Sequence, residues 1–247
     1  MSDKPIILYW IRRDLRVSDN PALTDALETG AEIIPVFIYD DWFSQLGAAP
    51  KFRLEKSLES LQKRYADLGS YVIIRQGAAI TVLRELINET GATSVIWSRD
   101  LDPMAISRDS KIKKDLKESG VSVTSYRGQV LFEPWTVSTK TGGFYRVYTP
   151  FWNSVRDRSV EPSFEAPNCV SSPVKKPETL TVKDLDLAIE MSRGRKILSQ
   201  YVEAGELAAQ TKLKKFLDGP VVNYSEDRNI PQLNGTSSLS DHLAWGE

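Results

Sequence analysis

The sequence has 247 residues, of which 41% are apolar and 26% are charged, and its formal net charge is -1. These values are ordinary for a globular protein, and they exclude one that binds nucleic acid through its entire surface, because such a protein carries a broad positive field. The single cysteine, Cys169, and the single histidine, His242, exclude an intramolecular disulfide and a zinc cluster built from these residues.

Five short runs of apolar and β-branched residues predict strands. They cover residues 6–11, 33–39, 71–74, 95–97 and 121–126. Between them, apolar residues recur at helical spacing, most clearly over residues 54–68 and 80–87. Strands that alternate with helices form parallel sheets through right-handed crossovers. Residues 1–130 therefore predict a doubly wound, Rossmann-like α/β domain, with a five-stranded parallel sheet and helices on both faces.

The first strand runs directly into a charged loop. Arg12, Arg13 and Arg16 lie at the carboxyl end of the strand, which is where doubly wound sheets bind ligands. The arginines could form a site for an anion or a partner domain, or they could pair with Asp14 and Asp19 in a network that holds the loop and docks the second region. We favour the network, because an arginine that is removed from water needs several acceptors.

Other loops of the α/β domain carry weaker signals. The first helix is predicted to start after Asn20, because asparagine caps free helix amides and Pro21 suits the first turn. No glycine-rich phosphate loop follows the first strand, so neither an NAD-type site nor a P-loop is expected. Asp100 and Asp102 follow the fourth strand, where carboxylates either bind the hydrogens of a sugar or ring, or form a solvated turn.

The chain changes character after residue 130. Residues 131–182 are expected to form a connecting segment that ends in a linker, since four prolines between residues 161 and 181 block helix formation. Residues 183–247 contain no strand-like run, and their apolar residues have helical spacing. We therefore expect a second, helical region there.

The end of this region carries a hydroxyl-rich stretch, NGTSSLS, at residues 234–240. Asn234–Gly235 is typical of a turn. Thr236, Ser237 and Ser240 place hydroxyls at a predicted helix start. This arrangement suits a phosphate or a pyrophosphate, although a plain hydroxyl cap has the same pattern.

Four stretches of the sequence together resemble the DNA photolyase and cryptochrome family, in their order and separations. They read WIRRDLRVSDNPAL, VIWSRDLDPMAISRD, LFEPWTVSTKTGGFYRVYTPFW and YSEDRNIPQLNGTSSLS. The resemblance covers nearly the whole chain. It implies that residues 1–130 form the antenna domain of the family and that residues 183–247 open its helical FAD-binding domain, most of which this sequence would then lack.

The resemblance implies light-dependent repair of cyclobutane pyrimidine dimers in DNA, in which reduced FAD donates an electron to the lesion while a second pigment harvests light. It also explains why catalytic side chains are scarce, because the cofactor supplies the chemistry. We expect the chain alone to be inactive and none of its side chains to be catalytic. A cryptochrome-type blue-light photoreceptor is one alternative. A stand-alone pigment- or nucleotide-binding α/β module is another.

The resemblance also assigns residues to the cofactor and to DNA. The residues that match the FAD-binding segment are Tyr224, Thr236, Ser237, Ser238, Leu239 and Ser240, and Arg228 matches an arginine that contacts the DNA backbone. Ser238 departs from the family pattern, which has arginine or lysine at this position, and Asp241 replaces a proline. Arg12, Asp14 and Arg16 are expected to secure the α/β domain against the helical one.

The antenna pigment is expected to be of the deazaflavin type rather than a folate. Folate-binding relatives have an Asn-Glu pair where this chain has Met104 and Ala105. Asp100 and Asp102 resemble the deazaflavin-binding version, in which Phe37 would line the same pocket. A flavin antenna, or none, is the alternative.

The resemblance and the composition together predict the partners. We expect the helical domain to bind DNA that contains pyrimidine dimers, and the protein to be a monomer. No apolar segment near the N-terminus is long enough for a signal peptide or a membrane span, so we expect a cytoplasmic protein without a membrane partner.

Overall fold

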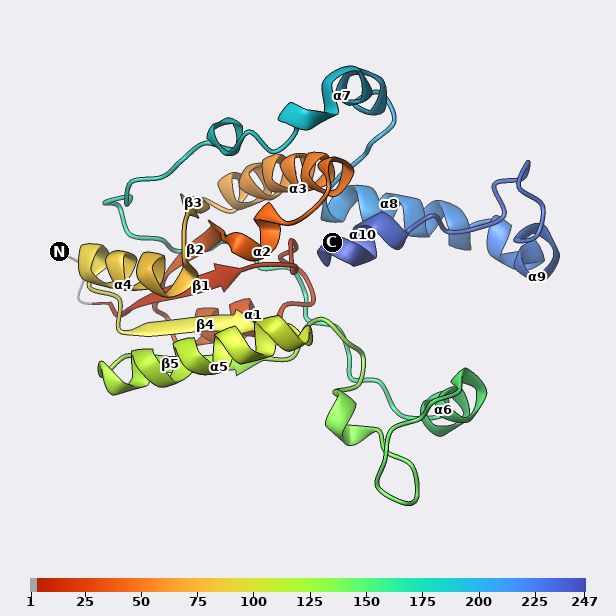
Figure 1. Cartoon of the computed structure of the whole chain (residues 1–247), viewed down its shortest axis with the longest axis horizontal. Coiled ribbons are helices and arrows are strands. Elements are labelled where there is room, and N and C mark those ends of the chain that lie inside the picture. Colours follow the sequence, from red (N-terminus) through yellow and green to blue (C-terminus); the bar gives the residue numbers. More distant parts are fainter. Residues whose placement is uncertain (1–3) are drawn as a thin grey trace.

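A parallel five-stranded sheet forms the centre of the computed structural model, which describes residues 4–247 (Figure 1). The strands are β1 (Ile6–Ile11), β2 (Glu32–Tyr39), β3 (Ile73–Gln76), β4 (Ser94–Ser98) and β5 (Ser122–Tyr126), in the order β3-β2-β1-β4-β5. This confirms the predicted fold class. The third strand starts two residues later than predicted, because its pairing with β2 begins at Ile73, opposite Val36.

Helices cover both faces of the sheet. One face packs against α1 (Pro21–Glu28) and α3 (Ala48–Asp67), and the other packs against α4 (Ala79–Thr90) and α5 (Pro103–Glu118). Alternate residues of β1 enter the two cores, since successive side chains of a strand point to opposite faces. The side chain of Asn20 accepts a hydrogen bond from the Leu23 amide at 3.1 Å, which confirms the predicted start of α1.

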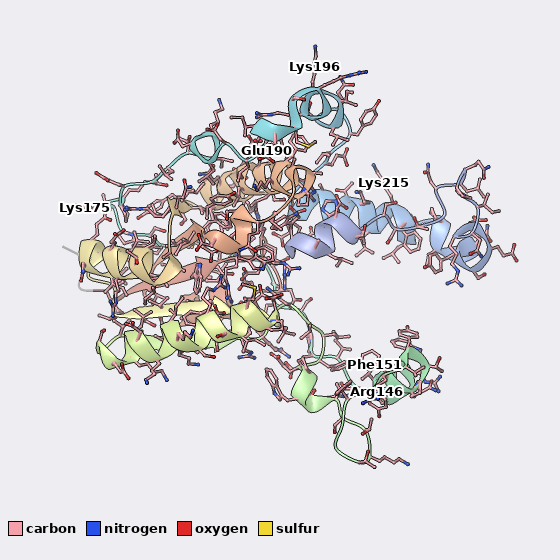
Figure 2. All side chains as sticks on the ribbon, in the orientation of Figure 1. Arg146, Phe151, Lys175, Glu190, Lys196 and Lys215 are labelled. Carbon is pink, nitrogen blue, oxygen red and sulfur yellow. The ribbon has the colours of Figure 1, made fainter. Side chains whose placement is uncertain are left out.

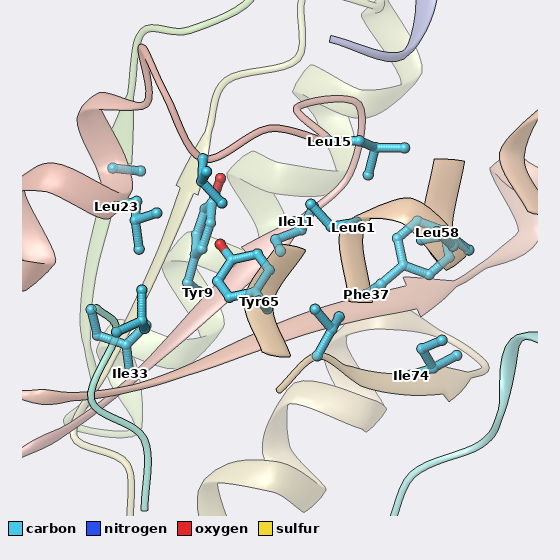
Figure 3. Packing of buried hydrophobic residues seen from close by; sticks show 14 of the residues in the cluster. Tyr9, Ile11, Leu15, Leu23, Ile33, Phe37, Leu58, Leu61, Tyr65 and Ile74 are labelled. Carbon is cyan, nitrogen blue, oxygen red and sulfur yellow. The ribbon is translucent and has the colours of Figure 1, made fainter. Parts of the chain in front are cut away.

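The first of these cores is dense beneath α3. Tyr9 and Ile11 of β1 pack with Phe37 of β2 and with Leu58 and Tyr65 of α3 (Figure 3). All five side chains are buried, and Phe37 has no exposed surface at all. A short helix, α2 (Asp41–Ser44), follows β2 at the edge of this core.

The connecting segment leaves the α/β unit after β5 and then returns to it. It contains the short helix η1 (Pro134–Thr136) and then α6 (Tyr148–Val155), which projects away from the sheet (Figure 1). Residues 161–181 form no helix or strand, as their prolines predict. They are nevertheless bound along the α/β unit, since the Val170 amide donates to the Leu68 carbonyl and the Leu180 amide to the Ile74 carbonyl, both at 2.9 Å.

Residues 183–247 are helical or irregular, as expected. Their elements are η2 (Val182–Leu185), η3 (Ile189–Met191), α7 (Ser192–Leu198), α8 (Glu206–Leu217), η4 (Pro220–Asn223), α9 (Tyr224–Asp227) and α10 (Ser240–Trp245). Helix α10 lies against the α/β unit, whereas α8 and α9 extend away from it (Figure 1). Among the described residues, no helix has the length and apolarity that a membrane crossing needs.

Candidate functional site

Arg12 is buried at the carboxyl ends of the central strands. Its guanidinium donates to the carboxylate of Asp109 and to the carbonyl of Ser98, and it lies 4.7 Å from the centre of the Trp10 ring. The expected pairing of Arg12 with Asp14 or Asp19 is therefore wrong. The loop places the Arg12 side chain over β4 and α5, where these other acceptors are available.

Asp14 holds the shape of the same loop instead. Its carboxylate accepts the hydroxyl of Tyr9 at 2.6 Å and the backbone amide of Arg12 at 2.9 Å. The Asn20 side-chain amide donates to the Tyr9 oxygen at 2.6 Å. Burial first, and then the Asp14 carboxylate, raise the pKa of Tyr9 well above its ordinary value, so Tyr9 is a neutral donor.

Two arginines of this loop bind the end of α10. Arg13 Nε donates to the carbonyl of Ala244 at 3.2 Å, and Arg16 Nη1 donates to the carbonyl of Gly246 at 3.0 Å. The carbonyls at a helix C-terminus have no partners within the helix, so cations are favourable there. Gly246 has a φ of +64°, and a Cβ at this position would lie 2.2 Å from the Arg13 carbonyl oxygen. The loop after β1 thus forms the docking site for α10, and this contact supports a structural role for Arg13 and Arg16.

The same loop receives the start of α8. The carboxylate of Glu206 accepts the backbone amides of Val17 at 3.1 Å and Ser18 at 2.9 Å. These contacts satisfy two amides at the turn of the loop. Both α8 and α10 are therefore docked on residues 13–18.

A buried charge cluster fixes α10 from the side of α3. Arg53 donates to Glu247 Oε2 at 2.5 Å, to Ser57 Oγ at 2.5 Å and to Asp241 Oδ2 at 3.2 Å. His242 Nδ1 lies 2.6 Å from the same Glu247 oxygen. Burial raises the pKa of Glu247 and of Asp241, but the hydrogen bonds from Arg53 and the neighbouring positive charges outweigh it, so both pKa values lie below their ordinary ones.

The segment expected to bind phosphate is accessible in this structure. Ser240 begins α10, and no side chain caps this helix, so the plain hydroxyl cap is not formed. Thr236 and Ser238 approach one another at 3.4 Å between their hydroxyl oxygens, while the hydroxyls of Ser237 and Ser240 make no hydrogen bond within residues 4–247. Lys212 of α8 donates to the Ser238 carbonyl at 3.3 Å. These hydroxyls and this ammonium are suitable donors for a diphosphate.

Tyr224 and Arg228 lie on α9 and at its end. The guanidinium of Arg228 lies 5.6 Å from the centre of the Tyr224 ring, and both side chains are exposed. Gly235 connects them to the hydroxyl-rich segment, because it is buried against Asp227 and a Cβ there would lie 2.5 Å from the Asp227 Cβ. The structure thus brings α9 and residues 235–240 together.

The residues expected to line an antenna pocket do not do so. Phe37 is enclosed in the core, as Figure 3 shows. Asp102 caps α5 by accepting the Met104 amide at 2.9 Å, and Asp100 accepts the Asp102 amide at 3.1 Å. Both carboxylates therefore stabilise the start of α5.

A cavity of about 350 Å³ lies beside this position, between α2, the start of α4 and α5. Its walls include Trp42, Ile80 and Met104, and its polar residues include Arg108 and Asp40. Arg108 Nη1 donates to Asp40 Oδ2 at 2.6 Å. The sequence predicted an antenna pocket shared by the loop after Phe37 and the loop of Asp100 and Asp102, and this cavity lies beside both loops. Its lining residues Asp40 and Trp42 were not singled out, although two aspartates and a tryptophan directly after β2 (DDW, residues 40–42) were an available signal.

A second, larger cavity of about 540 Å³ separates the α/β unit from the helices. Arg13, Arg16 and Arg127 contribute to it from the α/β side, and Gln210 and Leu243 from α8 and α10. Arg127 pairs with Glu161, and Arg16 is engaged with backbone carbonyls. The guanidinium groups that line this cavity already have hydrogen-bond or ion-pair partners, so we do not assign an anion-binding site to it.

The family described as DNA photolyase matches this chain over residues 7–168, which is more than half of its length. The chain belongs to the DNA photolyase family. The match begins in the first strand of the α/β unit and extends through most of the connecting segment.

Curated relatives within the photolyase family match nearly the whole chain. The deoxyribodipyrimidine photo-lyase of Agrobacterium fabrum is 39% identical over 243 residues, which are 98% of this chain and 50% of that protein. Cryptochrome-2 of Arabidopsis thaliana is 30% identical over an alignment of 254 positions, which covers 99% of this chain and 41% of that protein. The chain therefore spans about half the length of these relatives or less.

A solved photolyase has the same backbone arrangement. The crystal structure of a bacterial class III photolyase from Agrobacterium tumefaciens superposes with a TM-score of 0.93 at 36% identity. The superposition covers 100% of this chain and 51% of that one. It includes the projecting helices α6 and α8 to α10 as well as the sheet.

Proposed function

We propose that this chain supplies the antenna unit and part of the FAD site of a light-dependent enzyme that repairs cyclobutane pyrimidine dimers in DNA. The observation that carries the proposal is the 39% identity to a deoxyribodipyrimidine photo-lyase over 98% of the chain. The units we propose are residues 1–130 for the antenna, 131–182 for the connection and 183–247 for the start of the helical FAD domain. The proposed protein is a cytoplasmic monomer.

The hydroxyl-rich segment fits the diphosphate of FAD. Its unpaired hydroxyls belong to the half-buried Ser237 and the exposed Ser240, and neither is used in a helix cap. Lys212 reaches the same turn at the Ser238 carbonyl. Thr236, Ser238 and Leu239 complete the same turn, and Tyr224 would contact the cofactor from α9. When bound in its reduced form, FAD supplies the electron that splits the dimer. The residues of this chain only bind and orient the cofactor.

The proposed DNA contact is local. Arg228 is exposed beside α9, and its guanidinium can offer two parallel hydrogen bonds to a phosphate. The formal net charge of -1 provides no general attraction to a polyanion, so the rest of the DNA-binding surface must come from elsewhere in a longer protein. The proposed partner is DNA that contains a pyrimidine dimer.

The cavity next to α5 fits a planar antenna pigment. Its size, about 350 Å³, falls within the range of small-molecule pockets, and the Trp42 ring and the Met104 side chain provide apolar walls. Asp100 and Asp102 supported a deazaflavin, but their carboxylates serve α5. A deazaflavin, a folate and a flavin are therefore three candidate pigments for this cavity, and titration with each would identify the one that binds.

A cryptochrome-type photoreceptor is the second candidate, favoured by the 30% identity to Cryptochrome-2 over 99% of the chain. The test joins this chain to the second half of the Agrobacterium photolyase and assays dimer repair under blue light against a dark control. We expect repair by the joined protein and none by the 247-residue chain, which should also lose FAD on gel filtration. Light-induced flavin reduction without repair would favour the photoreceptor, and absence of flavin binding would favour a stand-alone pigment-binding module.

A further inference from the structure

Exposed apolar side chains are concentrated in one part of this molecule. Among the described residues up to 126, only Met104 and Ile106 are large, apolar and exposed, and all other such side chains lie from Val130 onward. Scattered exposed apolar residues are normal, but a concentration of them marks an interaction surface. The asymmetry shows that the α/β unit, together with Val170, Val182 and Trp245, buries its large apolar side chains, whereas the later segments leave many of theirs exposed.

The surface consists of two projecting segments. We call residues 130–160 the connecting arm and residues 189–233 the helical arm. In the connecting arm, Trp135 is 65% exposed and Tyr148 is 70% exposed, and the ring of Tyr148 stacks on Trp152 at 6.5 Å. Val155 is the only buried residue of α6, and α9 has none. Helix α6 of the connecting arm and helices α8 and α9 of the helical arm extend away from α4, whereas α7 at the start of the helical arm lies over α3 (Figure 1).

The helical arm exposes aliphatic side chains in addition to Tyr201 and Tyr224. Leu213 and Leu217 lie one turn apart on α8 and are both exposed, and Val222 follows them with 81% of its surface accessible. Exposed leucines one turn apart form the apolar stripe by which helices pack together. Figure 2 shows Lys196 and Lys215 of the helical arm, and Arg146 and Phe151 of the connecting arm, among the labelled side chains.

The charge of the arms favours a protein partner over a nucleic acid. The connecting arm has four basic and two acidic residues, and the helical arm has seven basic and six acidic residues. Several of the arginines already lie on aromatic rings of the arms, as Arg158 does at 4.4 Å from the centre of Phe132. Aromatic, aliphatic and arginine side chains with little net charge are typical of the core of a protein interface.

We propose that the two arms clasp one α-helical polypeptide, equivalent to the second half of the relatives, and that this polypeptide binds even when it is supplied as a separate chain. The superposition with the Agrobacterium photolyase covers the whole of this chain, both arms included, and 51% of that chain. The remainder of that chain is therefore the occupant that we propose for the exposed apolar surface of the arms.

The test co-expresses the tagged 247-residue chain with an untagged second half of the Agrobacterium photolyase and measures captured partner and complex mass. We expect a one-to-one complex. The double variants Tyr148→Ser/Trp152→Ser and Leu217→Ser/Val222→Ser should each reduce capture at least about ten-fold, because each removes the apolar surface of one arm. Ile106→Ser is the control, since it removes an exposed apolar group outside the arms and outside the lining of the proposed pigment cavity, and it should capture as much partner as the parent chain.

A second measurement keeps the test decisive if the separate half does not fold. Hydroxyl-radical footprinting would compare Trp135 and Trp152 in this chain with the same residues after the second half is joined to it. We expect oxidation at least about ten-fold slower in the joined protein, with Met104 unchanged. Equal oxidation there, full capture by both arm variants, or a homodimer that the arm variants dissolve would overturn the proposal. None of these measurements depends on flavin binding, so their outcome is independent of whether the protein repairs DNA.

Discussion

Removal of Arg53 should release α10 from the α/β unit without unfolding the sheet. Arg53 neutralises Glu247, whose side chain is fully buried, and it also binds Asp241 and Ser57. Breaking a buried ion pair by removing one partner costs about 3 to 5 kcal/mol, because the remaining charge is left without compensation. Detachment of α10 would expose Glu247 to water and avoid this cost. The variant should therefore lower the free energy of α10 docking and leave the core of the sheet unchanged.

Hydrogen exchange of the Leu15 amide measures this docking directly, since that amide donates to the Trp245 carbonyl at 3.1 Å. Each 1.36 kcal/mol is a factor of ten, so Arg53→Met should accelerate exchange in this peptide by roughly two to three and a half orders of magnitude. Lys63→Met, which removes an exposed positive charge from the same helix, should have no such effect. Adding Glu247→Gln to Arg53→Met should restore part of the protection.

The same contacts predict a pH dependence. Because the pKa values of Asp241 and Glu247 are lowered in the folded chain, their contribution to docking is present at neutral pH and is lost as the pH falls. Leu15 exchange corrected for its intrinsic rate should rise below the ordinary Glu value of 4.5. Exchange within about three-fold of the parent chain in Arg53→Met, or no recovery in the double variant, would show that Arg53 is not what holds α10.

Three further experiments test other parts of the structure. Limited proteolysis should first cut the connecting arm and the helical arm and leave residues 1–130 intact, since these residues form most of both buried cores. Early cuts within residues 1–130 would contradict the proposed units. In the protein joined to its second half, Arg228→Ala should weaken binding to damaged and undamaged duplex alike and lower the salt slope by roughly one, and a loss confined to damaged DNA would assign Arg228 to the lesion instead. Trp42→Ala should weaken pigment binding at least about ten-fold, measured by fluorescence quenching with a deazaflavin, a folate and a flavin. Asp102→Ala should mainly lower the free energy of unfolding by about 1 kcal/mol, because the cap of α5 is lost. The reverse pattern would place the pigment site at the loop of Asp102.

The α/β unit was predictable because its signals are local. Apolar runs with turns between them identified all five strands, and Asn20 followed by Pro21 identified the first helix start. Asp100 and Asp102 show the limit of such reasoning. A carboxylate at a strand end has the same sequence pattern whether it faces a ligand or caps the next helix, and only the backbone path into α5 separates the two.

Long-range partners were not predictable for a different reason. Arg12 binds Asp109, which is 97 positions away, and Arg53 binds Glu247, which is 194 positions away. No periodicity links such residues, because the folded path of the chain alone brings them together. The sequence marked Arg12 as an arginine that needs acceptors, and that physical requirement was met, but by residues outside the loop that was considered.

The position of Arg12 also explains where a ligand can bind in this sheet. In the order β3-β2-β1-β4-β5, the strand order reverses between β1 and β4, and this crevice is the usual ligand site of a doubly wound sheet. Here the crevice is occupied by Arg12, which bonds to the Ser98 carbonyl at the end of β4 and lies on Trp10 of β1. The available cavity is therefore displaced toward the end of β2, beside Asp40 and Trp42, and the docking site for α10 takes the opposite side. A single loop after β1 thus occupies the ordinary ligand site of the sheet and positions α10, the helix that follows the proposed phosphate-binding segment.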